Sequence, residues 1–155
     1  MSRLLPLAVL LAGTSTILSA SAQTPAGAAP AAASAMARSP SPAGAKVYIV
    51  SPLNGAKVKS PVTVVFGLAG MGIAPATVKF DNTGHHHLLI DADLPKDLGQ
   101  PLPATDNIRH FGKGQTEASI ELKPGKHTLQ LVLGDHMHIP FEPVVASQKI
   151  TITVE

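Results

Sequence analysis

Proline and glycine are spread densely through the chain and disfavour long helices. The 155 residues include 14 prolines and 13 glycines, and both residue types disfavour a helix interior. No segment repeats its apolar residues with a helical period over ten positions or more. Short runs that alternate apolar and polar side chains fill residues 46–155 instead, a pattern typical of β-strands that bury one face. The sequence therefore predicts an all-β domain.

Turn residues separate these runs. The Asn54-Gly55 pair after the first run is a strong turn signal, and residues 123–126 (KPGK) end a later one. A long proline-rich connection at residues 92–109 interrupts the pattern, and loops of that length are usually functional or disordered. About seven short strands at this spacing predict a single immunoglobulin-like antiparallel β-sandwich. The expected strands are residues 47–50, 61–68, 76–80, 87–91, 116–122, 127–133 and 148–154.

The N-terminus is typical of an exported protein. Residues 1–22 have a positive start at Arg3, an apolar stretch at 4–12 and a small-residue cleavage site at 20–22 (ASA), as secretory signal peptides do. The apolar stretch is too short to span a bilayer. Residues 23–45 are rich in Ala and Pro and are expected to form a flexible, disordered linker. We therefore expect a periplasmic or secreted protein, without membrane insertion after signal cleavage, whose β-sandwich domain covers residues 46–155.

Composition excludes several classes of function. The chain has no cysteine, so disulfides, a thiol nucleophile and thiolate metal sites are excluded. Twelve basic and ten acidic residues give a formal charge of +2, and there are four Phe, one Tyr and no Trp. Nucleic-acid binding needs a basic surface or an aromatic stacking platform, so no nucleic-acid partner is expected.

All seven histidines lie between His85 and His138, and four of them form two His-x-His pairs. Alternation along a strand places His85 and His87 on the face of Leu89, opposite the face of Leu88 and Ile90. The same rule places His136 and His138 together on the face of Val132, unless Gly134 introduces a bulge that reverses the assignment. His127 begins its strand and is expected at the opposite end of the domain.

The topology of a sandwich brings the two pairs together. The third and sixth strands of such a fold usually pair antiparallel, so the start of one lies beside the end of the other. Imidazoles without thiolates suit Cu, Zn, Ni or Fe, and the neighbouring Met137 favours copper, with zinc as the alternative. The predicted metal ligands are His85, His87, His110, His136 and His138, with Met137 as a weak axial candidate.

These residues favour a protein that binds a metal ion as a carrier, buffer or resistance factor. A second hypothesis is a non-enzymatic module that binds an envelope protein through residues 92–109, its histidines forming a polar network. A third is a metal-dependent redox enzyme with an open coordination position. The chain has no Gly-x-Ser-x-Gly elbow and no His-Glu-x-x-His motif, so no catalytic residue is predicted.

Several blocks of the sequence resemble a bacterial protein family. They are SPLNGAKVKSPVTVVFGLAGMGIAPA, NTGHHHLLID, HFGKGQTEASIELKPGKHTLQLVLGDHMHIP and KITITVE, and they cover nearly all of residues 46–155. The family is the domain-of-unknown-function family 4399, which consists of small exported proteins built around one domain. The resemblance implies a secreted or periplasmic β-sandwich and implies no particular activity.

Overall fold

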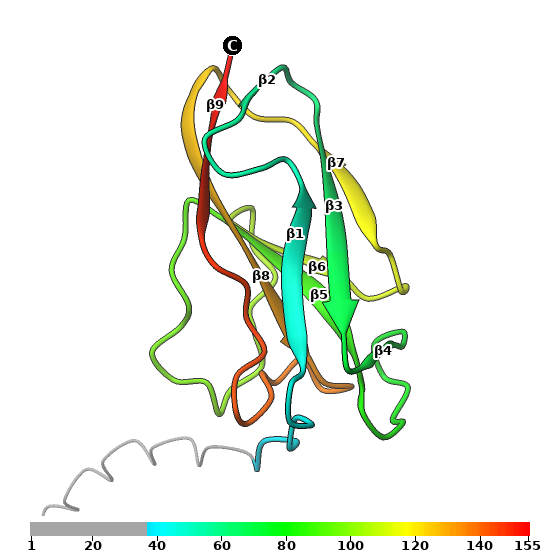
Figure 1. Ribbon diagram of the computed structural model, residues 1–155. Helices are drawn as coiled ribbons and strands as arrows, with labels where there is room; N and C mark the ends of the chain where they lie inside the picture. The colour runs from blue at the N-terminus through cyan, green and yellow to red at the C-terminus, as the bar shows by residue number, and fades with distance from the viewer. Residues whose placement is uncertain (1–36) are drawn as a thin grey trace, which may run out of the picture. The chain divides into compact units, whose positions relative to one another are not determined.

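The computed structural model describes residues 37–155, which form a β-sandwich (Figure 1). The predicted signal peptide and residues 23–36 of the predicted linker lie outside the described residues. Nine strands make up the two sheets, in agreement with the all-β prediction, and two of them have only two residues. The strands are β1 (Lys46–Ser51), β2 (Lys57–Val58), β3 (Val62–Ala69), β4 (Gly72–Ile73), β5 (Thr83–Ile90), β6 (Ile108–Phe111), β7 (Glu117–Ile120), β8 (Gly125–Gly134) and β9 (Ile150–Val154).

The smaller sheet has the order β1-β3-β7 and lies in front of the larger one in Figure 1. The larger sheet has the order β2-β9-β8-β5-β4, and β6 also pairs with β5. The short strands β2 and β4 run parallel to their neighbours, whereas the other pairs are antiparallel. Residues 37–155 contain no helix, and so none that could cross a membrane.

The main core lies between the two sheets. Phe66 of β3 faces Leu88 and Ile90 of β5 and the alternating leucines 129, 131 and 133 of β8. This is the face that alternation predicted for Leu88 and Ile90. A second apolar cluster covers the outer face of the larger sheet, where Leu89 and Val132 pack against Leu102 of the long loop. The loop that follows β5 is therefore folded onto the sheet and buries part of its outer face.

Two expectations about the elements need correction. Residues 76–80 do not form the expected strand: Thr77 has a φ of +71° and the Val78 amide donates back to the Pro75 carbonyl in a turn. Phe80 is 72% exposed, so the alternation there does not mark a buried face. Conversely, β5 begins at Thr83, four residues before the expected start, so the histidine triplet lies within the strand.

The folded domain also extends further towards the N-terminus than composition suggested. Residues 38–41, which we call the strap, run beside residues 140–143, with a parallel bridge between Pro40 and Glu142. The Ser41 amide donates to the Glu142 carbonyl at 3.0 Å, and the Glu142 amide donates to the Ser39 carbonyl at 2.9 Å. The contacts of the domain therefore begin before Lys46. Composition did not indicate this, because backbone hydrogen bonds can form with almost any side chain.

Candidate metal centre

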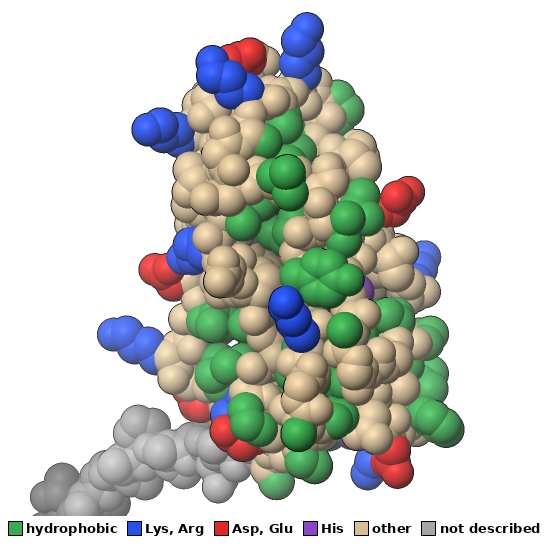
Figure 2. All heavy atoms as spheres, viewed as in Figure 1, with side chains coloured by type: hydrophobic (Ala, Val, Ile, Leu, Met, Phe, Trp, Pro, Cys, Tyr) green, Lys and Arg blue, Asp and Glu red, His purple; other side chains and the backbone are tan. Residues whose placement is uncertain are grey.

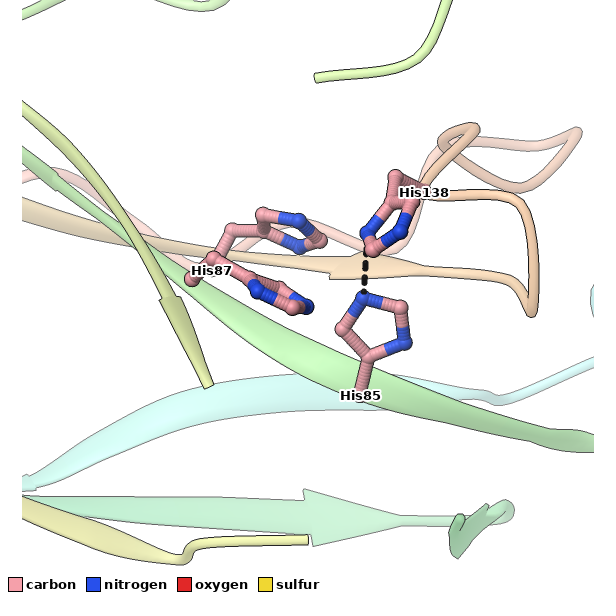
Figure 3. Close-up of side chains that lie close together, drawn as sticks. His85, His87 and His138 are labelled. Carbon is pink, nitrogen blue, oxygen red and sulfur yellow. Dashed lines mark hydrogen bonds between the residues drawn. The ribbon is translucent and has the colours of Figure 1, made fainter. Parts of the chain in front are cut away.

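Four histidines meet on the outer face of the larger sheet. His85 and His87 lie on β5, His110 lies on β6, and His138 lies in the loop after β8. Each offers one ring nitrogen, and these four nitrogens all lie within 4.8 Å of one another. Figure 3 shows the His85, His87 and His138 rings turned towards a common centre. On the face seen in Figure 2, which has the smaller sheet in front, histidine side chains are almost entirely hidden.

Strand alternation and register position three of these rings. His85 and His87 point to the same face as Leu89, and His86 points the other way, where its ring lies 5.0 Å from that of Phe66. His87 and His110 are directly opposed in the β5–β6 ladder. The β5–β8 ladder places Gly134 opposite His85, so the chain leaves β8 beside the cluster. The predicted convergence of the two histidine-rich segments thus follows from antiparallel pairing.

The fourth ring is positioned by a tight loop after Gly134. The Asp135 amide donates to the Ile139 carbonyl, and the His138 amide donates to the Asp135 carbonyl, both at 2.9 Å. His138 has a φ of +67°, which is in the left-handed region that residues with a side chain adopt infrequently. Such backbone strain persists where the surrounding contacts enforce it, and it is concentrated at functional sites. Here it turns the His138 ring back onto the sheet.

Two glycines leave room for the rings. A Cβ on Gly134 would lie 2.8 Å from Cε1 of His87, and a Cβ on Gly112 would lie 2.3 Å from Cε1 of His110. Real side chains do not come so close, so any residue other than glycine would displace these rings. The glycines next to the histidine blocks are therefore part of the site.

Burial leaves several ring nitrogens without partners. His85 and His87 are 0% and 1% exposed, and neither ring nitrogen of His87 makes a hydrogen bond. Nε2 of His85 forms a hydrogen bond with Nδ1 of His138 at 3.1 Å, while Nδ1 of His85 has no partner. Buried polar atoms without partners cost about 1–3 kcal/mol each. Three of these unpartnered nitrogens lie in the cluster, where they could bind a metal ion.

The same burial keeps the rings neutral. Burial, reinforced by the neighbouring histidines, lowers the pKa of His85 to about 4 and that of His87 to about 2. The pKa of His110 is also lowered, first by burial and then by His138. At neutral pH these three imidazoles therefore have a free lone pair, which is the form that binds metal ions.

The geometry suits one metal ion. Imidazole nitrogens bind zinc at about 2.0–2.1 Å, so two ligands in a tetrahedron lie about 3.3 Å apart. The 3.1 Å separation of the His85 and His138 nitrogens is close to that value. His138 is partly exposed and His110 is exposed, so the centre is buried on the side of β5 and accessible on the side of these two residues. A metal ion could enter from that side.

Four of the six predicted ligands are therefore brought together, and two are not. His136 is partly exposed and lines a cavity of about 440 Å³ next to residues 78–83. Met137 is 44% exposed, and neither residue belongs to the cluster of metal-ligating groups. The strand that would have continued through residues 135–138 ends at Gly134, so alternation no longer places His136 with His138. His127, predicted to lie apart, bonds to Asp91 and to the Lys123 carbonyl.

Asp135 is a site residue that was not among the predicted ones. Its carboxylate Oδ1 accepts from the Met137 amide at 2.9 Å and from the Ile139 amide at 3.0 Å, which closes the loop. An aspartate that accepts from the amide two residues later forms an Asx turn. The Gly134-Asp135 pair was the signal in the sequence that the strand stops there.

The family resemblance is confirmed by comparison with known proteins. A model of the family described as "Domain of unknown function (DUF4399)" matches residues 64–155. The chain belongs to the DUF4399 family. The part that matches the DUF4399 model begins within β3 and contains all four cluster histidines, together with Gly112, Gly134 and Asp135. No curated protein and no solved structure matches this DUF4399 chain.

Proposed function

We propose that this protein binds one copper ion through His85, His87, His110 and His138, and that it carries or buffers copper outside the cytoplasm. The main support is His87, which is 1% exposed, has no hydrogen-bond partner on either ring nitrogen, and lies within reach of three other imidazoles. A buried histidine without partners is costly unless a ligand binds it. The signal-like sequence at residues 1–22 supports the location.

The ligand set supports copper over other metals. Four imidazoles without a carboxylate or thiolate suit copper, zinc and nickel, and among divalent ions of this row copper binds most tightly. Zinc is the competitor that the geometry also allows. Met137 adds no weight to copper here, because it is exposed and outside the cluster.

Four protein ligands favour storage or transfer over turnover. Catalytic zinc sites typically have three protein ligands and an open position, whereas sites with four protein ligands are closed. The envelope-module hypothesis gains no support from the long loop, because Leu102 is buried on the sheet and its amide donates to the His138 carbonyl at 2.9 Å. That bond makes the loop a support of the metal centre.

A titration tests the proposal. The full chain is expressed, purified after export, stripped of metal and titrated with Cu(II) and Zn(II) by calorimetry, and the copper form is examined by electron paramagnetic resonance. We expect one copper per chain, nitrogen hyperfine coupling, and weaker binding of zinc. The His110→Ala/His138→Ala variant changes the accessible side of the site and should lose the binding. His136→Ala and His127→Ala are matched controls that should bind as the wild type does.

The proposal fails if wild type and the His110→Ala/His138→Ala variant bind copper equally weakly. It also fails if the His136→Ala control loses the binding, because the ligands would then differ from the cluster. A buffering role further predicts that cells without the gene tolerate less copper, and that the double variant does not restore tolerance.

A further inference from the structure

The strap joins the N-terminal side of the domain to the segment that follows His138. Nε of Arg38 donates to the Pro140 carbonyl at 2.9 Å, and its guanidinium also bonds to the Phe141 carbonyl and to the Glu142 carboxylate. Together with the backbone bonds between Ser39, Ser41 and Glu142, these contacts hold residues 38–41 along residues 140–143. Figure 1 shows the strap beside the loops between β8 and β9.

One side chain of the strap reaches the loop that presents His138. Oγ of Ser39 donates to Oδ2 of Asp135 at 2.6 Å. Asp135 is 4% exposed, and its other oxygen accepts from the Met137 and Ile139 amides. A buried carboxylate needs such hydrogen bonds to remain buried, and this one connects the strap to both sides of His138.

The loop conformation depends on these contacts. The left-handed backbone of His138 costs energy, and the bonds to Asp135 on either side of it oppose relaxation of the loop. If the loop relaxed, Nδ1 of His138 would leave its position 3.1 Å from Nε2 of His85.

We propose that Asp135 and Ser39 are positioning residues of the metal centre: they hold the 135–139 loop so that His138 binds the metal, and they make metal affinity depend on the docked strap. This inference rests on the proposed copper binding. It assigns residues 38–41, outside the region that matches the family model, a role in the metal site. Interactions that orient a metal ligand typically affect metal affinity by about 10- to 100-fold when they are lost.

Copper titration of full-chain variants tests this. We expect Asp135→Ala to weaken copper binding by about 10- to 100-fold. Ser39→Ala should weaken it by about five-fold, as expected for one lost hydrogen bond, and Ser39→Thr should restore it because the hydroxyl is retained. Ser41→Ala is the matched control: the Ser41 hydroxyl belongs to the same strap but donates to the Pro143 carbonyl, and its loss should leave the affinity unchanged.

A second measurement separates positioning from general destabilisation. In a His138→Ala background, Asp135→Ala and Ser39→Ala should cause no further loss of affinity, because their effect passes through His138. The resonance spectrum of Asp135→Ala should match that of His138→Ala. Additive losses, or wild-type affinity in both single variants, would overturn the positioning role while leaving copper binding established. Absence of copper binding by the wild type would overturn the proposed function and this inference together.

Discussion

His127 lies on β8 just beyond one end of the β5–β8 ladder, whereas His87 lies within that ladder, and the surroundings of the two rings differ completely. Nδ1 of His127 donates to the Asp91 carboxylate at 2.7 Å, and its Nε2 donates to the Lys123 carbonyl at 2.9 Å. His87 is paired with Val132 in the same ladder, is 1% exposed, and has no partner on either nitrogen. The first is a structural histidine whose donors are satisfied. The ring of the second makes no hydrogen bond, and its nitrogens are free to bind a ligand.

The pKa values of His127 and His87 are shifted in opposite directions. The hydrogen bond to Asp91 raises the pKa of His127, because both of its nitrogens face acceptors that favour the imidazolium. Burial lowers the pKa of His87 to about 2. Hydrogen bonding beside Asp91 therefore favours the protonated form of His127, whereas burial favours the neutral form of His87. Partners and burial, more than histidine content, distinguish a candidate ligand.

The largest effect that we expect from this difference is stabilisation by metal. Copper at a thousand times its dissociation constant should raise the free energy of unfolding by about 4 kcal/mol, because it binds the folded state. Urea denaturation with and without copper measures the increment. His127→Ala should retain the full increment, whereas His87→Ala, which lacks one of the four proposed ligands, should show a much smaller one. An equal increment in both variants would mean that copper binds elsewhere.

Acid should lower the free energy of unfolding of the metal-free protein, because the buried histidines of the cluster resist protonation in the folded state. The pKa of His85 falls from 6.5 to about 4 on folding, so the unfolded chain takes up a proton first as the pH falls below 6.5. Stability is therefore lost between pH 6.5 and 4, on the order of 3 kcal/mol for this residue, since one pKa unit corresponds to about 1.4 kcal/mol. Urea denaturation across this range measures the slope. The His85→Leu variant should have a flatter slope, and an unchanged slope would contradict the buried neutral state of His85.

The outer-face position of His85 and His87 could be predicted from the sequence because alternation along a strand is a local rule. Their approach to the end of β8 followed from the pairing expected in a sandwich. Local rules failed where the strand stopped: beyond Gly134, the Asp135 turn separates His136 from His138. The role of the strap could not be predicted either, because its hydrogen bonds join residues about a hundred positions apart and leave no local pattern.

Replacing the unpartnered histidine with an apolar residue should stabilise the metal-free protein. His87→Leu removes two buried nitrogens without hydrogen bonds and keeps a side chain of similar volume. We expect the free energy of unfolding to rise by about 1–3 kcal/mol at neutral pH, because even one such unpaired atom costs about that much. Urea denaturation of metal-free wild type and variant measures it. A marked loss of stability in His87→Leu would show that the ring supports the fold, as His127 does, and would remove the contrast between them.

The smallest effect concerns His127, and its pH dependence has the opposite sign. Because its pKa is raised on folding, its contribution is complete below pH 6.5 and is lost as the pH rises through the raised value. The pair with Asp91 is partly exposed, so His127→Ala should cost about 0.5–1 kcal/mol in acid and less in alkaline buffer. The free energy of unfolding of the variant is subtracted from that of the wild type at each pH. The titration of the metal cluster is the same in both proteins and so drops out of this difference. A nuclear magnetic resonance titration that placed the pKa of His127 below 6.5 would contradict this, since a ring that donates to a carboxylate and a carbonyl holds its second proton more tightly than a free one.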